Sequence, residues 1–219
     1  MTIRMCPSIL NADRGNILNE IRRIAPTSDF LHLDVMDGVF VPNTSFTDQE
    51  CAKIIENSPL LVDCHLMIND PDERAIEYAQ MGAHSITFHL EASSQPHMTL
   101  QTLGEYGVRR SLAIKPKTEF KGVIPYLDSL DMLLIMTVEP GFGGQTFMMD
   151  MLPKIKAARD YFDMHALNIW LEVDGGISIE TIRHAFGSGA DTFVAGSAVF
   201  KDSDPESMVS RIRQAASLK

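Results

Sequence analysis

The chain has 219 residues, of which 45% are hydrophobic and 22% are charged, a balance that supports a packed core and excludes an intrinsically disordered protein. Its 29 acidic residues outnumber its 19 lysines and arginines, so the formal net charge is −10. A chain this acidic lacks the basic surface that a nucleic acid requires of its partner, so we expect no nucleic-acid binding.

The sequence carries no signal for a membrane or for export. No apolar run approaches the ~18 residues that span a membrane, and the N-terminus has no apolar stretch long enough for a signal peptide. The three cysteines, Cys6, Cys51 and Cys64, form no C-x-x-C pair, which favours a reducing compartment over a disulfide scaffold. We therefore expect a cytoplasmic protein with one domain over residues 1–219 and no membrane partner.

Short apolar runs alternate with amphipathic stretches along the chain. The apolar runs predict strands at residues 3–10, 30–36, 60–68, 85–90, 109–114, 132–138, 168–173 and 192–195. The amphipathic stretches predict helices at residues 15–24, 48–57, 71–81, 98–106, 119–127, 149–162, 179–187 and 205–218. Strands that alternate with helices form βαβ units, and about eight units in a chain of this length predict a single α/β domain with the (β/α)8 TIM barrel fold.

An open, doubly wound sheet is the competing architecture. Such a sheet usually shows a G-x-G-x-x-G segment after its first strand. Here the first expected strand ends in Ser8, Ile9, Leu10 and Asn11, and no such segment follows. The barrel is therefore the favoured fold.

Polar residues occupy alternate positions of three expected strands. One face of each strand is apolar and must meet the helices, so the other face points into the barrel. The inward residues are His32, Asp34 and Met36 on one strand, Asp63, His65 and Met67 on the next, and Trp170, Glu172 and Asp174 on a third. Because barrel interiors are normally filled with branched apolar side chains, the buried charges need an explanation.

Four inward residues lie near the carboxyl ends of their strands, where barrel active sites form. They are His32, Asp34, His65 and Asp174. A hydrogen-bonded barrel interior is one interpretation. Two imidazoles and two carboxylates also suit Zn²⁺, Fe²⁺, Mn²⁺ or Co²⁺, and we favour a site for one divalent metal ion per chain.

The remaining inward residues have simpler interpretations. Asp63 and Glu172 lie deeper along their strands and are interpreted as structural groups that support the site. Met36, Met67 and Met136 end inward strand positions, where they are either ordinary core residues or a polarizable apolar lining of the site.

Three glycine-bearing turns follow the last three expected strands. They consist of Gly141, Phe142, Gly143 and Gly144, then Gly175 and Gly176, then Gly196 and Ser197. Each turn alone would indicate only a positive φ angle or tight packing. Together, with Ser197 expected to open a helical turn, they resemble a phosphate cradle of backbone N–H groups. No Lys or Arg lies in these turns, so a metal ion and aligned amides would supply the positive potential.

Seven segments of the chain carry a recognisable pattern. They are residues 6–10 (CPSIL), 32–38 (HLDVMDG), 40–43 (FVPN), 63–67 (DCHLM), 136–145 (MTVEPGFGGQ), 171–176 (LEVDGG) and 195–197 (AGS). Together these segments resemble the ribulose-phosphate 3-epimerase family. The likeness runs from about residue 3 to residue 200, and the segment that ends in GFGGQ is highly specific.

The resemblance implies a ribulose-phosphate-binding barrel that interconverts D-ribulose 5-phosphate and D-xylulose 5-phosphate in the pentose phosphate pathway. It also implies metal ligands at His32, Asp34, His65 and Asp174, with Asp34 as the proton acceptor and Asp174 as the proton donor. Substrate contacts are implied at Ser8, residues 141–144, residues 174–176, Gly196 and Ser197, and we add His65 and the three methionines as candidates. The family forms dimers and hexamers, so we expect a homo-oligomer.

The chemistry agrees with this resemblance. Epimerisation at C3, beside the C2 ketone, removes an acidic C–H proton and returns a proton to the opposite face through an enediolate. Two carboxylates on well-separated strands can stand on the two faces, and a divalent metal ion can stabilise the enediolate. The sequence shows no nicotinamide or flavin fingerprint, and the reaction needs no redox cofactor.

Three alternatives remain. A sister epimerase acting on a six-carbon substrate such as D-allulose 6-phosphate is the nearest, although the GFGG and DGG segments favour the pentulose. Orotidine-phosphate decarboxylase uses a related barrel, but it needs a Lys two residues after the Asp of the second strand, where this chain has Met36. A non-catalytic sugar-phosphate-binding barrel would be favoured by loss of a ligand, and all four ligand positions are intact.

Overall fold

A computed structural model describes residues 2–217 and shows eight strands in one parallel sheet. The strand order is β1-β8-β7-β6-β5-β4-β3-β2. The strands are β1 (Arg4–Cys6), β2 (Leu31–Met36), β3 (Val62–Met67), β4 (Ser85–His89), β5 (Arg109–Ile114), β6 (Met132–Met136), β7 (Trp170–Asp174) and β8 (Thr192–Val194). The predicted strands are confirmed, although β1 is much shorter than expected.

The sheet closes into a barrel between β1 and β2. The His32 N–H donates to the Pro7 carbonyl oxygen at 3.1 Å, and Ser8 forms a parallel bridge with His32. The chain after Cys6 turns at this point into a short 3₁₀ helix, Ile9–Asn11, whose first turn is capped by the Ser8 hydroxyl. Ser8 is thereby placed at the top of the closing seam, beside the inward residues of β2.

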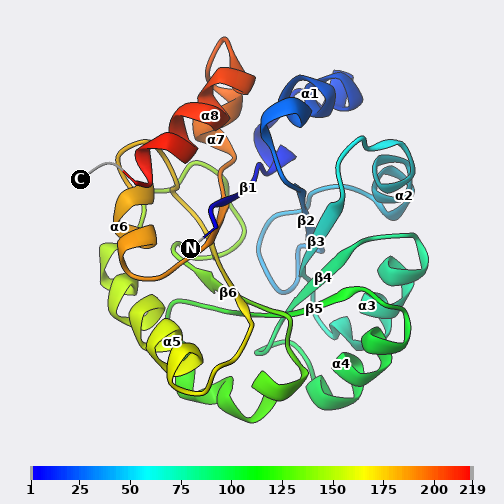
Figure 1. The fold of residues 1–219 in the computed structure, drawn as a ribbon. Coiled ribbons are helices and arrows are strands. Elements are labelled where there is room, and N and C mark those ends of the chain that lie inside the picture. Colours follow the sequence, from blue (N-terminus) through cyan, green and yellow to red (C-terminus); the bar gives the residue numbers. More distant parts are fainter. Residues whose placement is uncertain (1, 218–219) are drawn as a thin grey trace.

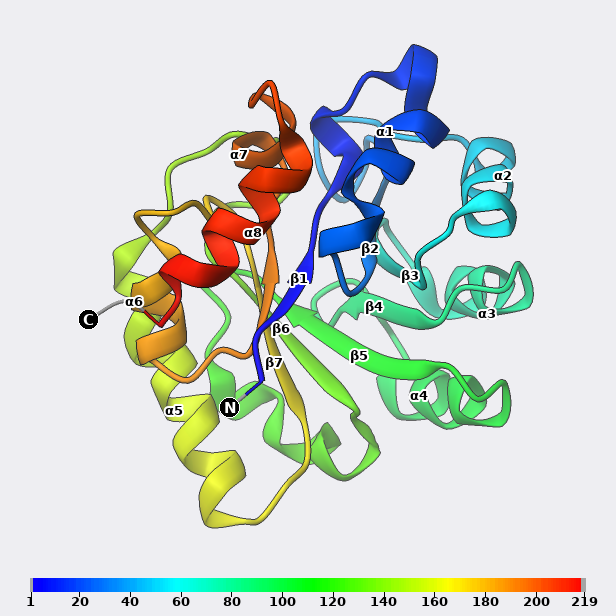
Figure 2. The same ribbon diagram turned by 45° about the horizontal axis from the view of Figure 1, so that its top comes forward.

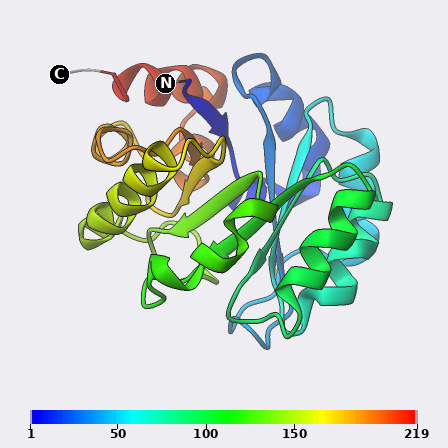
Figure 3. The ribbon, with the colours of Figure 1, turned by 60° about the horizontal axis from the view of Figure 1, so that its bottom comes forward.

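Helices surround the strands (Figure 1). They are α1 (Ile17–Ile24), α2 (Asp48–Asn57), α3 (Pro71–Gln80), α4 (Pro96–Glu105), α5 (Leu152–Met164), α6 (Ile182–Gly187), α7 (Ser197–Phe200) and α8 (Pro205–Ala215). The C-terminal helix α8 packs beside β1 (Figures 2 and 3). At this contact the Arg213 guanidinium donates to the Ile3 carbonyl oxygen at 3.0 Å. Within residues 2–217, no helix has the length and apolar character needed to cross a membrane.

The predicted helix at residues 119–127 is wrong. The segment forms two 3₁₀ helices, Phe120–Gly122 and Ile124–Ser129. Pro125 has no N–H to donate to the residue-121 carbonyl, and its ring would clash there in an α-helix. The predicted helix at 205–218 ends at Ala215 in the structure, and residue 218 lies outside the described residues.

Because side chains alternate along each strand, one set packs between the sheet and the helices and the other set points into the barrel. Leu31, Leu33 and Val35 are buried on the outer face of β2, in the hydrophobic core that lies between sheet and helices. In the register of β2 with β3, His32 lies beside Asp63 and Asp34 lies beside His65. All residues of both strands are buried, so these polar side chains must satisfy one another inside the barrel.

A cation–aromatic stack closes the amino-terminal end of the barrel. The guanidinium carbons of Arg4 and Arg109 each lie 3.7 Å from the centroid of the Trp170 ring, and Phe30 meets the same indole edge-on at 5.6 Å. Arg4, Arg109 and Trp170 begin β1, β5 and β7. The stack covers the acidic interior layer that contains Glu172, so packing and electrostatics act together there.

We expect Trp170→Ala to lower the free energy of unfolding by about 2–3 kcal/mol, because it removes both cation–π contacts and opens the floor of the barrel. Urea unfolding followed by circular dichroism measures this change. The Trp170→Phe variant keeps a ring between the two guanidinium groups and should lose less than half as much. Equal stability of Trp170→Ala and the wild type would contradict a stabilising role for the stack.

Candidate active site

Four side chains meet at the carboxyl ends of β2, β3 and β7. His32, Asp34, His65 and Asp174 each offer a ligand atom, and these atoms lie within 4.8 Å of one another. His65 Nδ1 lies 3.3 Å from Asp34 Oδ1, 3.4 Å from His32 Nε2 and 3.7 Å from Asp174 Oδ2. The structure thus brings together all four residues that the sequence singles out as metal ligands.

The donor set fits a divalent metal ion. Two imidazole nitrogens and two carboxylates are ligands suited to Zn²⁺ and to similar ions of the first transition row. The side chains of both histidines are fully buried, whereas that of Asp174 is 17% exposed. The two histidines are therefore shielded from solvent, and solvent has access to the cluster at Asp174.

The cluster also requires a positive charge. Burial, reinforced by the negative charge of Asp34, raises the pKa of Asp174 to about 6. Burial acts in the same direction on Asp34, but the charges and hydrogen bonds of His32 and His65 outweigh it and hold the pKa of Asp34 well below its usual range. Burial lowers the pKa of His32, but Asp34 and Asp63 outweigh burial and raise it. Either a bound proton or a metal ion can supply the positive charge that balances the two carboxylates.

Each histidine of the cluster is held through its second ring nitrogen. His32 Nδ1 lies 2.8 Å from Asp63 Oδ2, and His65 Nε2 lies 3.0 Å from His89 Nε2. His89 Nδ1 in turn lies 3.3 Å from a carboxylate oxygen of Glu91. Sequence reasoning assigned a supporting role to Asp63 but missed His89 and Glu91.

Glu172 lies in a deeper layer of the barrel with Asp63 and His32. One ligand atom of each of these three residues lies within 4.8 Å of the others. Among the described residues, neither carboxylate oxygen of Glu172 has a hydrogen-bond partner. Burial and the nearby charge of Asp63 raise the pKa of Glu172, which disfavours its charged form. This layer agrees with the structural role that the sequence suggests for both acids.

A pocket opens above the four-residue cluster. It is lined by the expected residues Ser8, Asp34, Met36, Met67, Met136, Gly141, Phe142, Gly143, Gly144, Asp174, Gly175, Gly176, Gly196 and Ser197. His32 and His65 are not among its lining residues, because they lie beneath Asp34 and Asp174. The Ser8 hydroxyl donates to Asp34 Oδ2 at 2.5 Å, which orients this carboxylate at the base of the pocket.

The turn after β7 requires glycine at two consecutive positions. Gly175 and Gly176 have φ angles of +122° and +68°. A Cβ atom on Gly176 would lie 2.4 Å from the backbone nitrogen of Phe147, and one on Gly175 would lie 2.4 Å from a Val138 methyl group. Close approach of the loop after β6 therefore explains this pair, which presents backbone to the pocket instead of side chains.

Two polar residues beside the glycine turns were not expected from the sequence. The Asn11 side chain fills the space over Gly143, where a Cβ atom would meet its Oδ1 at 2.2 Å. The Lys201 ammonium lies 3.7 Å from the position that a Cβ atom would take on Gly144, at the same distance as Ser197 Oγ. Lys201 follows α7, so a cation from outside the glycine turns lies beside Gly144.

The loop between β2 and α2 covers one edge of the pocket. Val41 packs with Met36 and Met67, and the ring of Phe40 lies 4.8 Å from that of His89. The Lys115 ammonium lies 3.6 Å from the centroid of the Phe40 ring on this loop. Two of the three candidate methionines thus take part in apolar packing that holds the covering loop.

The closed parallel barrel, with a polar cluster at the carboxyl ends of its strands and glycine turns after its last three strands, is the architecture of sugar-phosphate-binding TIM-barrel enzymes. Among solved structures, the chain resembles 3-keto-L-gulonate-6-phosphate decarboxylase from Vibrio cholerae (TM-score 0.70, 15% identity, 99% of this chain and 98% of that one). It also resembles 3-hexulose-6-phosphate synthase from Salmonella typhimurium (TM-score 0.66, 16% identity, 98% of each chain). At these identities the likeness shows the fold.

The sequence comparisons show the family. The model of the ribulose-phosphate 3 epimerase family matches residues 4–200. Ribulose-phosphate 3-epimerase of Mycobacterium leprae is 41% identical over 212 residues, covering 97% of this chain and 94% of that protein. The enzyme of the same name from Bacillus subtilis is 39% identical over 213 residues, with 96% and 98% coverage. The chain belongs to the ribulose-phosphate 3-epimerase family.

We expect His32→Asn to weaken Zn²⁺ binding by at least about tenfold, since the variant loses one of four ligands together with its contact to Asp63. Metal analysis after equilibrium dialysis measures the ions bound per chain. His84→Asn is the matched control, because His84 is exposed and lies outside the cluster. A folded His32→Asn protein that still binds one Zn²⁺ per chain with wild-type affinity would contradict the assignment.

Proposed function

We propose that this protein is a ribulose-phosphate 3-epimerase that interconverts D-ribulose 5-phosphate and D-xylulose 5-phosphate. The observation that carries the proposal is the position of two carboxylates, Asp34 and Asp174, in one cluster that lines the same pocket as the three glycine turns. The family match and the names of its relatives support the same reaction.

The two carboxylates approach the pocket from different parts of the ring. Asp34 lies two residues before the end of β2 and Asp174 ends β7, three strands away through β1 and β8. A planar intermediate between them presents one face to each carboxylate. Asp34 takes the C3 proton on one face and Asp174 donates a proton to the other, and the roles exchange in the reverse reaction. The Ser8 hydroxyl holds Asp34 in place for this transfer.

His32, Asp34, His65 and Asp174 would hold the metal ion. When bound, a divalent ion supplies Lewis-acid stabilisation of the negative charge that develops on the substrate oxygens as C3 loses its proton. We propose one ion per chain, drawn from Zn²⁺, Fe²⁺, Mn²⁺ and Co²⁺, all of which such a donor set accepts.

The substrate phosphate is assigned to the glycine turns. Residues 141–144, 175–176 and 196–197 line the pocket, and side chains are excluded from residues 175–176 by the close packing described above, so backbone N–H groups are the expected donors to the phosphate. The Lys201 ammonium adds a positive charge next to Gly144. We propose that it pairs with the phosphate and supplies a local positive charge in a chain whose formal net charge is −10.

Three further proposals complete this function. The first concerns the size of the sugar, and we favour the pentulose over D-allulose 6-phosphate because of the GFGG and DGG segments. The second is that the protein is a cytoplasmic enzyme of the pentose phosphate pathway with one domain over residues 1–219. Assembly as a homodimer or hexamer, with no nucleic-acid or membrane partner, is the third. Steady-state assays with both sugar phosphates and sedimentation of the purified chain test the first and the last.

We expect Asp174→Asn, with its metal content checked, to exchange deuterium into C3 of D-ribulose 5-phosphate through Asp34 while forming almost no D-xylulose 5-phosphate. Asp34→Asn should show the opposite preference and exchange from the xylulose side. Proton NMR in D₂O follows both exchange and inversion. Near wild-type epimerisation by metal-replete Asp174→Asn would show that another group serves the second face.

Lys201→Met should raise KM for D-ribulose 5-phosphate by about three- to tenfold and leave kcat nearly unchanged, because a charge-assisted contact with the non-reacting phosphate is lost. The inhibition constant of inorganic phosphate should rise in parallel. Lys121→Met is the control, since Lys121 is exposed and pairs with Glu119. Unchanged KM and phosphate inhibition in Lys201→Met would remove Lys201 from the cradle.

A further inference from the structure

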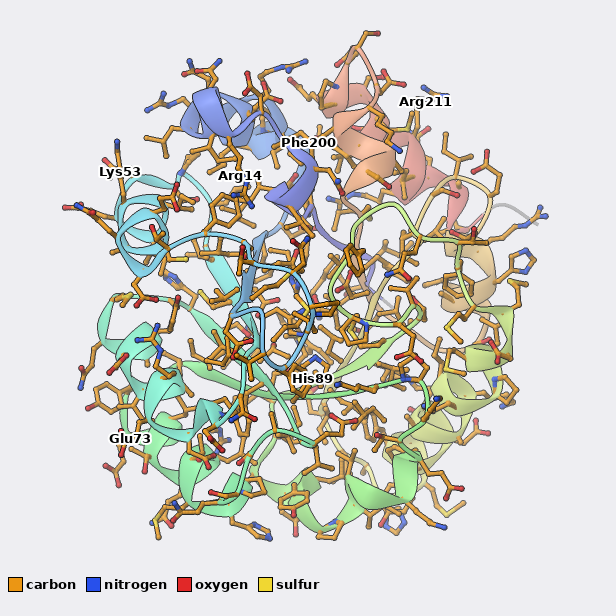
Figure 4. The ribbon with its side chains drawn as sticks, turned by 180° about the vertical axis from the view of Figure 1, so that it is seen from behind. Arg14, Lys53, Glu73, His89, Phe200 and Arg211 are labelled. Atoms are coloured by element: carbon orange, nitrogen blue, oxygen red, sulfur yellow. The ribbon has the colours of Figure 1, made fainter. Side chains whose placement is uncertain are left out.

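His89 is a fully buried histidine that belongs neither to the metal cluster nor to the pocket lining. It ends β4, and its Nε2 atom lies 3.0 Å from Nε2 of His65. Its ring centroid lies 5.1 Å from that of His65 on one side and 4.8 Å from that of Phe40 on another. Figure 4 shows His89 near the centre of the view, whereas Lys53 and Glu73 lie at the periphery of the molecule.

Glu91 fixes the other nitrogen of His89. Its Oε2 atom lies 3.3 Å from His89 Nδ1, and its Oε1 atom accepts a hydrogen bond from the Lys115 N–H at 2.7 Å and another from the Thr118 hydroxyl. Burial would raise the pKa of Glu91, but these hydrogen bonds outweigh it and hold the pKa at about 2, so the group is an ionised acceptor. His89 must therefore donate its Nδ1 proton to Glu91.

We propose that Glu91 and His89 act as positioning residues, which hold His65 in the tautomer that carries its proton on Nε2 and leaves Nδ1 free as a metal ligand. The inference rests on the proposed metal site and adds two residues to it. Neither residue touches substrate or metal in this assignment, since only His65 Nδ1 faces the four-residue cluster.

The direction of the hydrogen bond between the two histidines follows from the donor count. Two ring nitrogens 3.0 Å apart share one proton, so one of them donates and the other accepts. The Nδ1 proton of His89 is already committed to the Glu91 carboxylate, and His65 Nδ1 faces the metal cluster, so the proton between the two rings belongs to His65 Nε2. His89 Nε2 is then the acceptor, and His65 Nε2–H is the donor.

The two candidate ligands are consequently supported in different ways. His32 donates directly to the carboxylate of Asp63 at 2.8 Å, whereas His65 reaches a carboxylate only through a second imidazole. A hydrogen-bond partner on the second ring nitrogen fixes the tautomer and the ring orientation of a ligand histidine. Asp63 does this directly for His32, whereas His89 and Glu91 together do it for His65.

The covering loop protects the relay from water. Phe40 packs against His89, and the Lys115 ammonium lies 3.6 Å from the centroid of the Phe40 ring. Lys115 also supplies the backbone N–H that binds Glu91. The loop that covers the pocket and the residues that orient His65 thus share one set of contacts.

The test uses the full chain loaded with Zn²⁺ and has two readouts besides activity. Long-range ¹H–¹⁵N correlation spectra report which ring nitrogen of each of the seven histidines carries a proton, and His65→Asn assigns the His65 signals. Competition with a chromophoric chelator measures Zn²⁺ affinity. We compare the wild type with His89→Leu, His89→Gln and Glu91→Gln, and we use His84→Leu and Glu105→Gln as exposed controls.

The wild type should show a slowly exchanging Nε2–H on His65. His89→Leu should lose this slow exchange and bind Zn²⁺ about 10–100-fold more weakly. His89→Gln retains an acceptor oxygen and should recover part of both properties, and Glu91→Gln should show a smaller loss. Wild-type Zn²⁺ affinity and a protected Nε2–H in a folded His89→Leu protein would overturn the proposal.

Two outcomes separate this inference from the proposed function. Loss of Nε2–H protection and of Zn²⁺ affinity in His89→Leu supports the relay even in a protein that does not epimerise D-ribulose 5-phosphate. Full epimerase activity with unaltered Zn²⁺ affinity in both His89→Leu and Glu91→Gln overturns the relay and leaves the proposed function intact. Where His89→Leu does not fold, Glu91→Gln decides alone: a wild-type His65 signal and affinity overturn the inference.

Discussion

The buried pairing of β2 with β3 is the constraint on which the site depends. The register sets His32 beside Asp63 and Asp34 beside His65, and every residue of both strands is buried. A slip by one residue would turn these groups out into the apolar layer beneath the helices. The 2.8 Å contact between His32 and Asp63 opposes such a slip, because breaking it would leave a buried charge without a partner.

The inward residues of the site could be predicted because strand alternation is a strict rule. Period two, applied to three strands, placed His32, Asp34, His65 and Asp174 on one interior surface, where the structure brings them together. The same rule would have found His89. Ser85, Thr87 and His89 alternate with Ile86 and Phe88 along β4, so this strand also turns a polar face inward.

Contacts that depend on tertiary approach could not be predicted in the same way. Lys201 reaches Gly144 because α7 carries the chain back over the glycine turns, and no period in the sequence marks that return. Glu91 lies two residues beyond β4, where its role depends on the loop that contains Lys115 and Thr118. The segment 119–127 is different, because Pro125 argues against an α-helix there even though the apolar spacing favours one.

The amino-terminal end of the barrel contains stabilising contacts, and the carboxyl end contains the candidate active site. At the amino-terminal end, Arg4 and Arg109 enclose Trp170 and bring two positive charges beneath the acids of the deeper layer. Burial and the charge of Asp63 raise the pKa of Glu172 there, which disfavours a second negative charge in this layer. At the carboxyl end, Asp34 and Asp174 lie close enough to repel each other. The uncompensated negative charge of these carboxylates therefore lies at the base of the pocket. A cation bound there would also attract an anionic substrate.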